Sequence, residues 1–119
     1  MATGIIGTGS FLPPTIIDNN ELAKMVKTDD EWIREHTGIV ERHIATDETT
    51  SYMATEAALA AIENAGIEPK EIDLILLATL SPERATPSMS CIVQDKIGAV
   101  NATCFDLNAA CSGFVYALQ

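Results

Sequence analysis

Three cysteines are the side chains of this chain best suited to covalent chemistry, and one of them has a setting that favours it. Cys111 follows an apolar stretch directly and stands where a helix is predicted to begin, between small residues on both sides. A strand-to-helix turn of this kind lifts a side chain clear of the sheet, as in the nucleophile elbow of hydrolases. Amides at a helix N-terminus stabilise a nearby anion, which favours the thiolate. A buried structural cysteine is the alternative interpretation.

The other two cysteines are expected to fill the core. Cys91 falls inside a predicted helix and Cys104 inside a predicted strand, and neither is followed six positions later by the arginine of a phosphatase loop. The three cysteines have no CxxC spacing, so the sequence predicts neither a zinc site nor a closed disulfide framework. No metal is expected.

Three further features could bind ligands. Gly7-Thr8-Gly9 follows an apolar stretch, but prolines stand where the helix of a dinucleotide loop would start, which argues against that loop. His36 and His43 lie in charged sequence without metal-ligand spacing and are expected to be solvated or structural. Trp32, the single tryptophan, is either a core anchor or a flat surface on which a ring-bearing ligand stacks.

The elements that position these residues follow an α/β order. Asp73–Leu80 is a continuous apolar run, typical of a parallel strand covered on both faces. The alanines of the helix predicted after Thr49 share one face, which allows close packing on a flat partner. The predicted elements are a strand over Ala2–Phe11, a helix over Glu21–Val26 capped near Asp18, a helix opened by a Thr28/Glu31 capping box and ended at Gly38, an edge strand or an exposed loop over Ile39–Ile44, a helix from Thr49 to Gly66, the strand Asp73–Leu80, a helix over Ser88–Ile97, a strand over Thr103–Asn108 and a helical start over Phe114–Leu118.

Composition narrows the class of protein. The 119 residues are 47% hydrophobic and 20% charged, which suits a globular domain. Seven Lys and Arg against seventeen Asp and Glu give a net charge of −10, so nucleic-acid binding is not expected. No apolar run is long enough for a membrane span, and no signal peptide is visible, so we expect a cytoplasmic protein. The chain stops inside a helix that has barely begun, and we expect it to be the front portion of a larger protein.

The segment around Cys111 carries a family resemblance. Phe105-Asp106-Leu107-Asn108-Ala109-Ala110-Cys111-Ser112-Gly113-Phe114 resembles the active-site segment of β-ketoacyl-acyl-carrier-protein synthase III, the enzyme family that starts bacterial type II fatty acid synthesis. The stretches Gly4–Pro13, Thr28–Ala45 and Asp73–Ser88 agree with the same family, in order and at its spacing. The resemblance implies that residues 1–119 are the first half of a thiolase-like layered fold, an α/β fold with a mixed, largely parallel sheet.

The resemblance also implies a reaction. Cys111 would take the acyl group of an acyl-CoA as a thioester. Malonyl-acyl-carrier protein would then lose CO₂, and the resulting carbanion would attack the acyl-cysteine in the initiating decarboxylative Claisen condensation. The family holds the developing enolate with a histidine and an asparagine, which we expect outside these residues, so the 119 residues alone are expected to be inactive. Both reactants are substrates, and no cofactor is expected.

Three positions match the family's CoA-binding residues. Trp32 matches a position whose indole stacks on the adenine of CoA, and Thr28 and Thr37 match neighbouring CoA contacts. His36 stands where many members carry arginine, so whether it or Arg34 contacts CoA stays open.

Thr86 replaces the phenylalanine that narrows the acyl pocket of acetyl-specific relatives, where it reaches across the homodimer interface. The smaller threonine predicts a deeper pocket that accepts branched or longer primers. Because the chain has few cations, we expect the docking patch for an acidic carrier protein outside these residues. Two alternatives remain: another thiolase-fold condensing enzyme, such as a secondary-metabolite acyltransferase or a hydroxymethylglutaryl-CoA synthase, or a non-catalytic fragment that packs against a partner.

Overall fold

A computed structural model describes residues 3–119 and divides them into two compact units. One unit is Leu12–Glu48. The other joins the segment that ends at Phe11 to the long stretch Thr49–Gln119.

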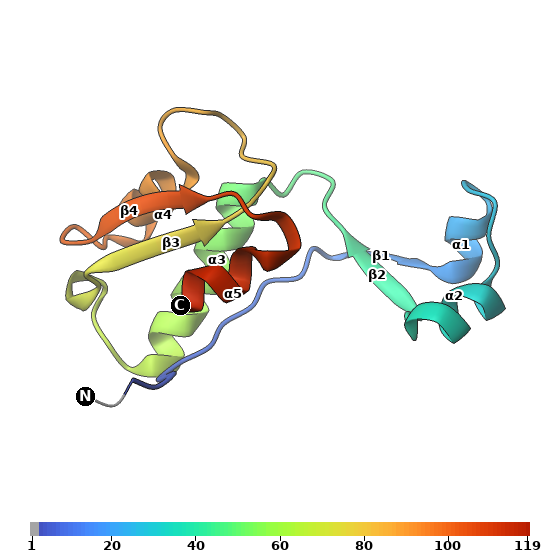
Figure 1. The fold of residues 1–119 in the computed structure, drawn as a ribbon, viewed down its shortest axis with the longest axis horizontal. Helices are drawn as coiled ribbons and strands as arrows, with labels where there is room; N and C mark the ends of the chain where they lie inside the picture. The colour runs from blue at the N-terminus through green and yellow to red at the C-terminus, as the bar shows by residue number, and fades with distance from the viewer. Residues whose placement is uncertain (1–2) are drawn as a thin grey trace. The chain divides into compact units, whose positions relative to one another are not determined.

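The Leu12–Glu48 unit pairs two short strands with two helices (Figure 1). Strand β1 (Thr15–Asp18) runs antiparallel to β2 (Glu41–Ile44), with Thr15 opposite Ile44. This agrees with the strand predicted over Ile39–Ile44. The chain between them forms α1 (Asn19–Ala23) and α2 (Asp30–Thr37). Asp18 caps α1 as predicted, accepting a hydrogen bond from the Glu21 amide at 2.8 Å, but α1 begins earlier and ends earlier than the predicted helix.

The predicted capping box at the start of α2 is wrong. The N-cap is Asp29, whose carboxylate accepts a hydrogen bond from the Trp32 amide at 2.8 Å. Aspartate is a stronger N-cap than threonine, and it wins over its neighbour Thr28. The helix ends as predicted at Gly38, which adopts a left-handed φ of 73° that suits glycine.

A fully buried asparagine joins the elements of this unit. The Asn19 amide donates to the Asp30 carboxylate at 2.7 Å and to the Ile39 carbonyl at 2.8 Å, and its oxygen accepts from the Arg42 guanidinium. Hydrogen bonds from Asn19 and Arg34 hold the pKa of Asp30 below its ordinary value. The start of α2, which carries Trp32, is therefore fixed to β2 and α1.

The second unit is built on a parallel strand pair, as the sequence predicted. Strand β3 (Leu74–Ala78) pairs with β4 (Thr103–Leu107) from Leu74 opposite Thr103 to Ala78 opposite Leu107. The pair is packed by α3 (Thr50–Ala65), α4 (Met89–Ile97) and α5 (Gly113–Leu118), with short 3₁₀ turns at η1 (Pro69–Glu71) and η2 (Ala110–Ser112). The predicted limits of both helices agree with the structure to within one residue: Thr49 and Gly66 cap α3, and Ser88 and Gly98 cap α4. Figure 1 shows these elements together.

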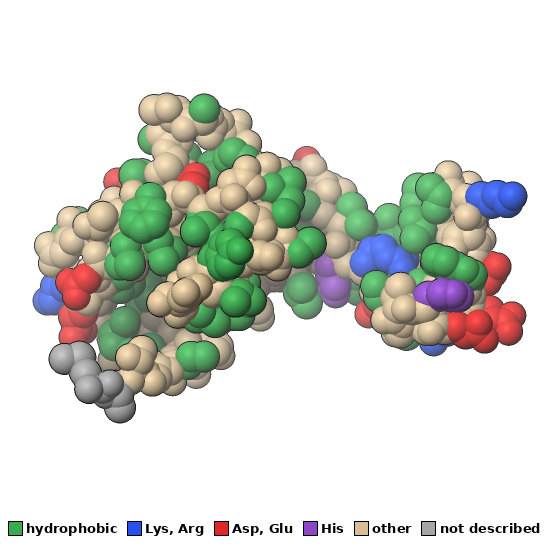
Figure 2. All heavy atoms as spheres, in the orientation of Figure 1, with side chains coloured by type: hydrophobic (Ala, Val, Ile, Leu, Met, Phe, Trp, Pro, Cys, Tyr) green, Lys and Arg blue, Asp and Glu red, His purple; other side chains and the backbone are tan. Residues whose placement is uncertain are grey.

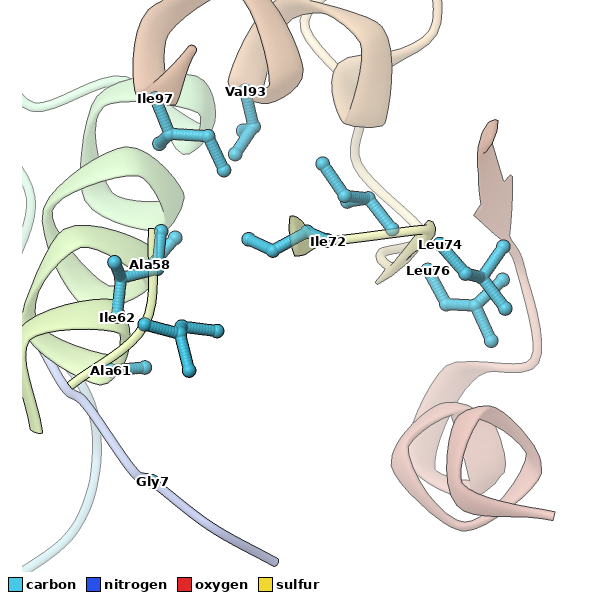
Figure 3. Close-up of a pocket in the computed structure, with 11 residues that line it drawn as sticks. Gly7, Ala58, Ala61, Ile62, Ile72, Leu74, Leu76, Val93 and Ile97 are labelled. Atoms are coloured by element: carbon cyan, nitrogen blue, oxygen red, sulfur yellow. The ribbon is translucent and has the colours of Figure 1, made fainter. Parts of the chain in front are cut away.

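The core of this unit lies between α3, α4 and β3. Val93, Ile97 and Ala99 are buried, and apolar side chains of α3 and β3 pack against them. A cavity of about 330 Å³ opens beside this cluster. Figure 3 shows the side chains of Ile62, Ile72, Val93 and Ile97 around it. Its lining contains no titratable group, so it offers no chemistry of its own.

The strand predicted over Ala2–Phe11 is wrong for the described part of that range, and Ala2 lies outside the described residues. Residues 3–11 form an extended segment without a strand partner. The segment follows α3 instead: the Thr8 amide donates to the Asn64 side chain at 3.0 Å, and Gly7 and Gly9 press against the helix backbone. The alanine face of α3 makes this approach possible, as its small side chains predicted.

Hydrophobic side chains are prominent on the surface of the second unit. Figure 2 shows them gathered over α5 and the neighbouring strands. Phe114, Val115, Tyr116 and Leu118 of α5 are all exposed. Among the described residues, no helix combines the length and the apolar character that crossing a bilayer requires.

Candidate active site

The turn that carries Cys111 has the geometry predicted from the sequence. Strand β4 ends at Leu107, Ala110 adopts a left-handed φ of 44°, Cys111 follows inside η2, and α5 begins at Gly113. A positive φ is strained for a residue with a side chain, and such strain is concentrated at functional turns. Cys111 is exposed at this turn. The buried-cysteine alternative is therefore wrong for this residue.

Gly113 lets the helix start directly against the sheet. It is buried, and a Cβ atom at its position would lie 3.0 Å from the Cβ of Ala78 and 3.8 Å from Leu107. That approach places the first turn of α5 at the end of β3. Cys111 is thus held between two rigid elements rather than on a free loop.

A cavity of about 660 Å³ opens beside Cys111. Small alanines of α3, the C-terminal half of β3 and the apolar face of α5 form its walls, and Cys111 supplies a sulfur atom to the lining. The lining contains no charged group. The space suits an uncharged acyl chain held next to a thiol.

The other two cysteines differ from each other in exposure. Cys91 is exposed, which corrects the prediction that it fills the core: α4 buries Met89, Ser90, Val93 and Ile97, and position 91 falls on the other face. Cys104 is partly buried as expected. Burial, with Cys91 nearby, raises the pKa of the Cys104 thiol and makes it a poor nucleophile.

Thr86 lies on the exposed loop between β3 and α4, followed by the cis peptide bond to Pro87. Glu83 of this loop accepts a hydrogen bond from the buried Ser51 amide at 2.6 Å, at the start of α3. That hydrogen bond holds the pKa of Glu83 below its ordinary value. The loop is therefore tied to the helix whose alanines line the Cys111 cavity.

A second carboxylate fixes the other end of the same loop. Asp106 of β4 accepts hydrogen bonds from the amides of Met89 at 2.7 Å and Ser90 at 2.8 Å, at the start of α4. Burial raises the pKa of Asp106, but these hydrogen bonds outweigh it, so the pKa lies below its ordinary value. Sequence reasoning missed both carboxylates, because each is acidic and polar in sequence and only the fold brings it to a helix N-terminus.

The candidate nucleotide-binding residues lie on the Leu12–Glu48 unit. Thr28 and Trp32 line a cavity of about 280 Å³ together with Lys27 and Asp29, which the sequence did not single out. Trp32 is 54% exposed, which rules out the core-anchor interpretation. Because Asp29 is the N-cap of α2, the Thr28 hydroxyl is not occupied as the helix cap.

Three other candidate side chains of the Leu12–Glu48 unit make hydrogen bonds within that unit. The Thr37 hydroxyl donates to the Ile33 carbonyl at 2.6 Å and accepts from the Ile39 amide at 3.1 Å. The Arg34 Nε atom donates to both oxygens of Asp30, at 2.7 and 2.8 Å. His43 hydrogen-bonds to the Pro13 carbonyl, consistent with the structural role expected for it. Thr37 does not line the cavity that Thr28 and Trp32 share.

Within residues 3–119, no group of three His, Cys, Asp or Glu side chains gathers as metal ligands.

The fold and the site place the chain in a class of protein: it is a fragment of a thiolase-like α/β fold with a cysteine at a strand-to-helix turn, and the solved structures agree. The chain superimposes on 3-oxoacyl-[acyl-carrier-protein] synthase III from Aquifex aeolicus VF5 with a TM-score of 0.94 and 52% identity, covering 98% of this chain and 38% of that one. It matches the priming β-ketosynthase of the R1128 polyketide biosynthetic pathway with a TM-score of 0.92 and 41% identity, covering 96% of this chain and 34% of that one.

The curated proteins point to the same family. Over 115 residues, 97% of this chain, the sequence is 59% identical to β-ketoacyl-[acyl-carrier-protein] synthase III of Clostridium acetobutylicum. The chain spans about a third of the length of the curated relatives it matches, 35% in this case. No family model matches the chain. The resemblance to the N-terminal portion of β-ketoacyl-acyl-carrier-protein synthase III is confirmed.

Proposed function

We propose that the complete protein is an acyltransferase that joins an acyl-CoA primer to malonyl-acyl-carrier protein in the initiating condensation of type II fatty acid synthesis. One observation carries the proposal: Cys111 is an exposed thiol on a strained turn, in the lining of an uncharged cavity. The names of the similar proteins, β-ketoacyl-[acyl-carrier-protein] synthase III among them, support this reaction class.

The first half-reaction is a thioester exchange. The Cys111 thiolate attacks the carbonyl carbon of the acyl-CoA thioester, the carbon–sulfur bond to CoA breaks, and CoA leaves as a thiolate that takes up a proton. The acyl group is now a thioester of Cys111, so it keeps its activation. The apolar cavity beside the sulfur receives the acyl chain.

The second half-reaction forms the carbon–carbon bond. Malonyl-acyl-carrier protein loses CO₂, and the electron pair of the broken bond becomes the carbon nucleophile. That carbon attacks the acyl carbonyl, and the Cys111 sulfur leaves as the thiolate. The family resemblance assigns enolate stabilisation to a histidine and an asparagine. Neither His36 nor His43 lies in a segment that matches the family's catalytic motif, and one ring nitrogen of each is already bonded to a backbone carbonyl. We therefore expect the catalytic pair outside residues 1–119 and the 119 residues alone to be inactive.

Substrate binding follows from the resemblance and the cavity at α2. Trp32 stacks on the adenine of CoA, and Thr28 lines the same cavity, which supports its role as a neighbouring contact. Thr37 stays a prediction, since both hydrogen bonds of its hydroxyl go to backbone groups next to α2. The protein works as a cytoplasmic homodimer, with Thr86 reaching toward the acyl pocket of the partner and leaving room for branched or longer primers.

One observation favours a second candidate function. The similarity to a priming β-ketosynthase of a polyketide pathway fits a secondary-metabolite acyltransferase with the same acyl-cysteine chemistry. The two functions share the first half-reaction and differ in the carrier protein that delivers malonate.

Mass spectrometry of the carrier protein tests the proposal. The complete protein is incubated with a short acyl-CoA and malonyl-acyl-carrier protein of either the fatty acid or a polyketide type. We expect the β-ketoacyl product on the fatty acid carrier, with no product from Cys111→Ser. Product only on the polyketide carrier would select the second candidate. No product on either carrier, from a protein that binds both substrates, would exclude both.

A further inference from the structure

The aromatic pair on α2 has a geometry that the family resemblance did not predict. The rings of Trp32 and His36 are stacked, with centroids 4.3 Å apart and planes inclined by 18°. The two residues are four positions apart, so consecutive turns of α2 bring them to the same face. Nearly parallel aromatic rings at this separation attract each other by more than their buried area alone provides.

A hydrogen bond fixes the imidazole in this position. The His36 Nδ1 atom lies 2.8 Å from the Trp32 carbonyl oxygen. A carbonyl can only accept, so Nδ1 carries the proton and the bond runs from Nδ1–H to the oxygen. The imidazole is held at its ring edge by the backbone of Trp32 and at its face by the indole. Its rotamer, and with it that of the indole, is restricted before any ligand arrives.

The indole keeps an accessible surface on the other side. Trp32 lines the cavity of about 280 Å³ with Lys27, Thr28 and Asp29, and His36 is not part of that lining. The imidazole thus stacks on the indole outside the cavity lining, and 54% of Trp32 remains exposed, which leaves indole surface for a second ring. Lys27 supplies a cation at the same cavity, where the phosphates of a nucleotide would need one.

Arg34 does not take the place of His36. Its Nε atom is bound to both oxygens of Asp30, and Asp30 is held in turn by the buried Asn19. His36 is thus the side chain that contacts Trp32 from the following turn of α2.

We infer that His36 is a positioning residue of the nucleotide subsite: it backs the indole of Trp32 and holds it in the orientation in which a purine ring stacks on its open side. The inference rests on the proposed function, because it takes the nucleotide part of an acyl-CoA as the ligand. A pre-oriented indole loses less conformational freedom on binding, so the backing ring raises affinity without touching the ligand. Removing a stacked ring of this kind is expected to weaken binding about 3- to 10-fold.

The single tryptophan makes the test direct, because all indole emission of residues 1–119 comes from this site. The complete protein, with any further tryptophan replaced by phenylalanine, is titrated with coenzyme A while its fluorescence is followed. We expect quenching in the wild type, a dissociation constant raised about 3- to 10-fold in His36→Ala, and a value within about twofold of wild type in His36→Phe, which keeps a flat ring. Glu35→Gln, a change at an exposed neighbour on α2, is the matched control.

A second readout separates positioning from a general loss of structure. Acylation of Cys111 is compared between an acyl-CoA and the corresponding acyl-N-acetylcysteamine thioester, which lacks the nucleotide. His36→Ala should slow acylation by the acyl-CoA at low concentration and leave acylation by the truncated thioester unchanged. Wild-type affinity in His36→Ala, with quenching intact, would overturn the positioning role and leave the proposed function standing. Absence of quenching in the wild type would overturn nucleotide binding at Trp32 itself.

Discussion

Replacing Gly9 with alanine puts a methyl group where helix α3 already is. A Cβ atom at Gly9 would lie 2.1 Å from the Ala57 carbonyl oxygen, 2.4 Å from the Ala61 nitrogen and 3.0 Å from the Ala60 carbonyl carbon. All three atoms belong to the backbone of a regular helix, so no side chain can rotate away. The extended segment must instead withdraw by roughly 1 Å or more to reach an ordinary contact distance.

The cost follows from that displacement. A withdrawal of this size forfeits a quarter to a half of the dispersion energy of each contact along the segment, and overpacking of this kind costs about 1–3 kcal/mol. For a domain of this size, the loss lowers Tm by roughly 5–20 °C. The effect also reaches the site, because Ala57 lines the cavity beside Cys111.

Thermal unfolding followed by circular dichroism measures the change. Tryptophan emission is unsuitable here, since Trp32 belongs to the Leu12–Glu48 unit. Gly4→Ala is the matched control: a Cβ atom there meets nothing within 4 Å, so its stability should stay within about 0.5 kcal/mol of wild type. If Gly9→Ala melted within about 2 °C of Gly4→Ala, the segment would not pack on α3 as described.

Three further changes test the site. Hydrogen bonding lowers the pKa of Asp106 in the folded state, so its contribution to stability is present above the unfolded pKa and is lost as the pH falls. Between about pH 5 and 3, urea unfolding should show a smaller loss of unfolding free energy for Asp106→Asn than for wild type. An equal loss in the two proteins would contradict this role. In competition assays of the complete protein, Thr86→Phe should shift primer preference toward acetyl-CoA at least about tenfold, or about 1.4 kcal/mol. A wild-type protein that already prefers acetyl-CoA about tenfold over four- to eight-carbon primers would refute the deeper pocket. Gly113→Ala, whose Cβ would lie 3.0 Å from that of Ala78, should lower the free energy of unfolding by about 1–3 kcal/mol and slow alkylation of Cys111. Adding Ala78→Gly to the same chain should restore the stability and the alkylation rate. If it restored neither, the contact between positions 113 and 78 would not be the cause.

Local signals in the sequence were enough to predict most helices and strands of the second unit. Helices α3 and α4 are capped by Thr49 and Ser88 at their N-termini and by Gly66 and Gly98 at their C-termini, and such capping is decided by residues next to each other in the chain. The same is true of the Cys111 turn, whose small residues are adjacent in sequence.

The sequence predictions were wrong where a tertiary contact determines the local structure. Residues 3–11 have an apolar pattern that reads as a strand, but their glycines give them a close contact with α3 in place of a ladder partner. Cys91 reads as a core residue until the packing of α4 on β4 shows which face is buried. Choosing between Thr28 and Asp29 as a cap depends on a difference of a few tenths of a kcal/mol, which pattern alone does not resolve.

The candidate site shows the same division. Cys111 and Trp32 could be singled out because a cysteine at a turn and a lone tryptophan are visible in the sequence. The anchoring carboxylates Glu83 and Asp106 could not, since each acts on a helix more than fifteen residues away in the chain.

Intact-mass spectrometry of the complete protein after incubation with a short acyl-CoA tests the central claim most directly. We expect one acyl adduct that maps to Cys111, is absent from Cys111→Ser and persists in Cys91→Ser, a matched control because Cys91 is also exposed. An adduct that survives Cys111→Ser, or no adduct on a protein that binds CoA, would contradict the assignment of Cys111 as the nucleophile.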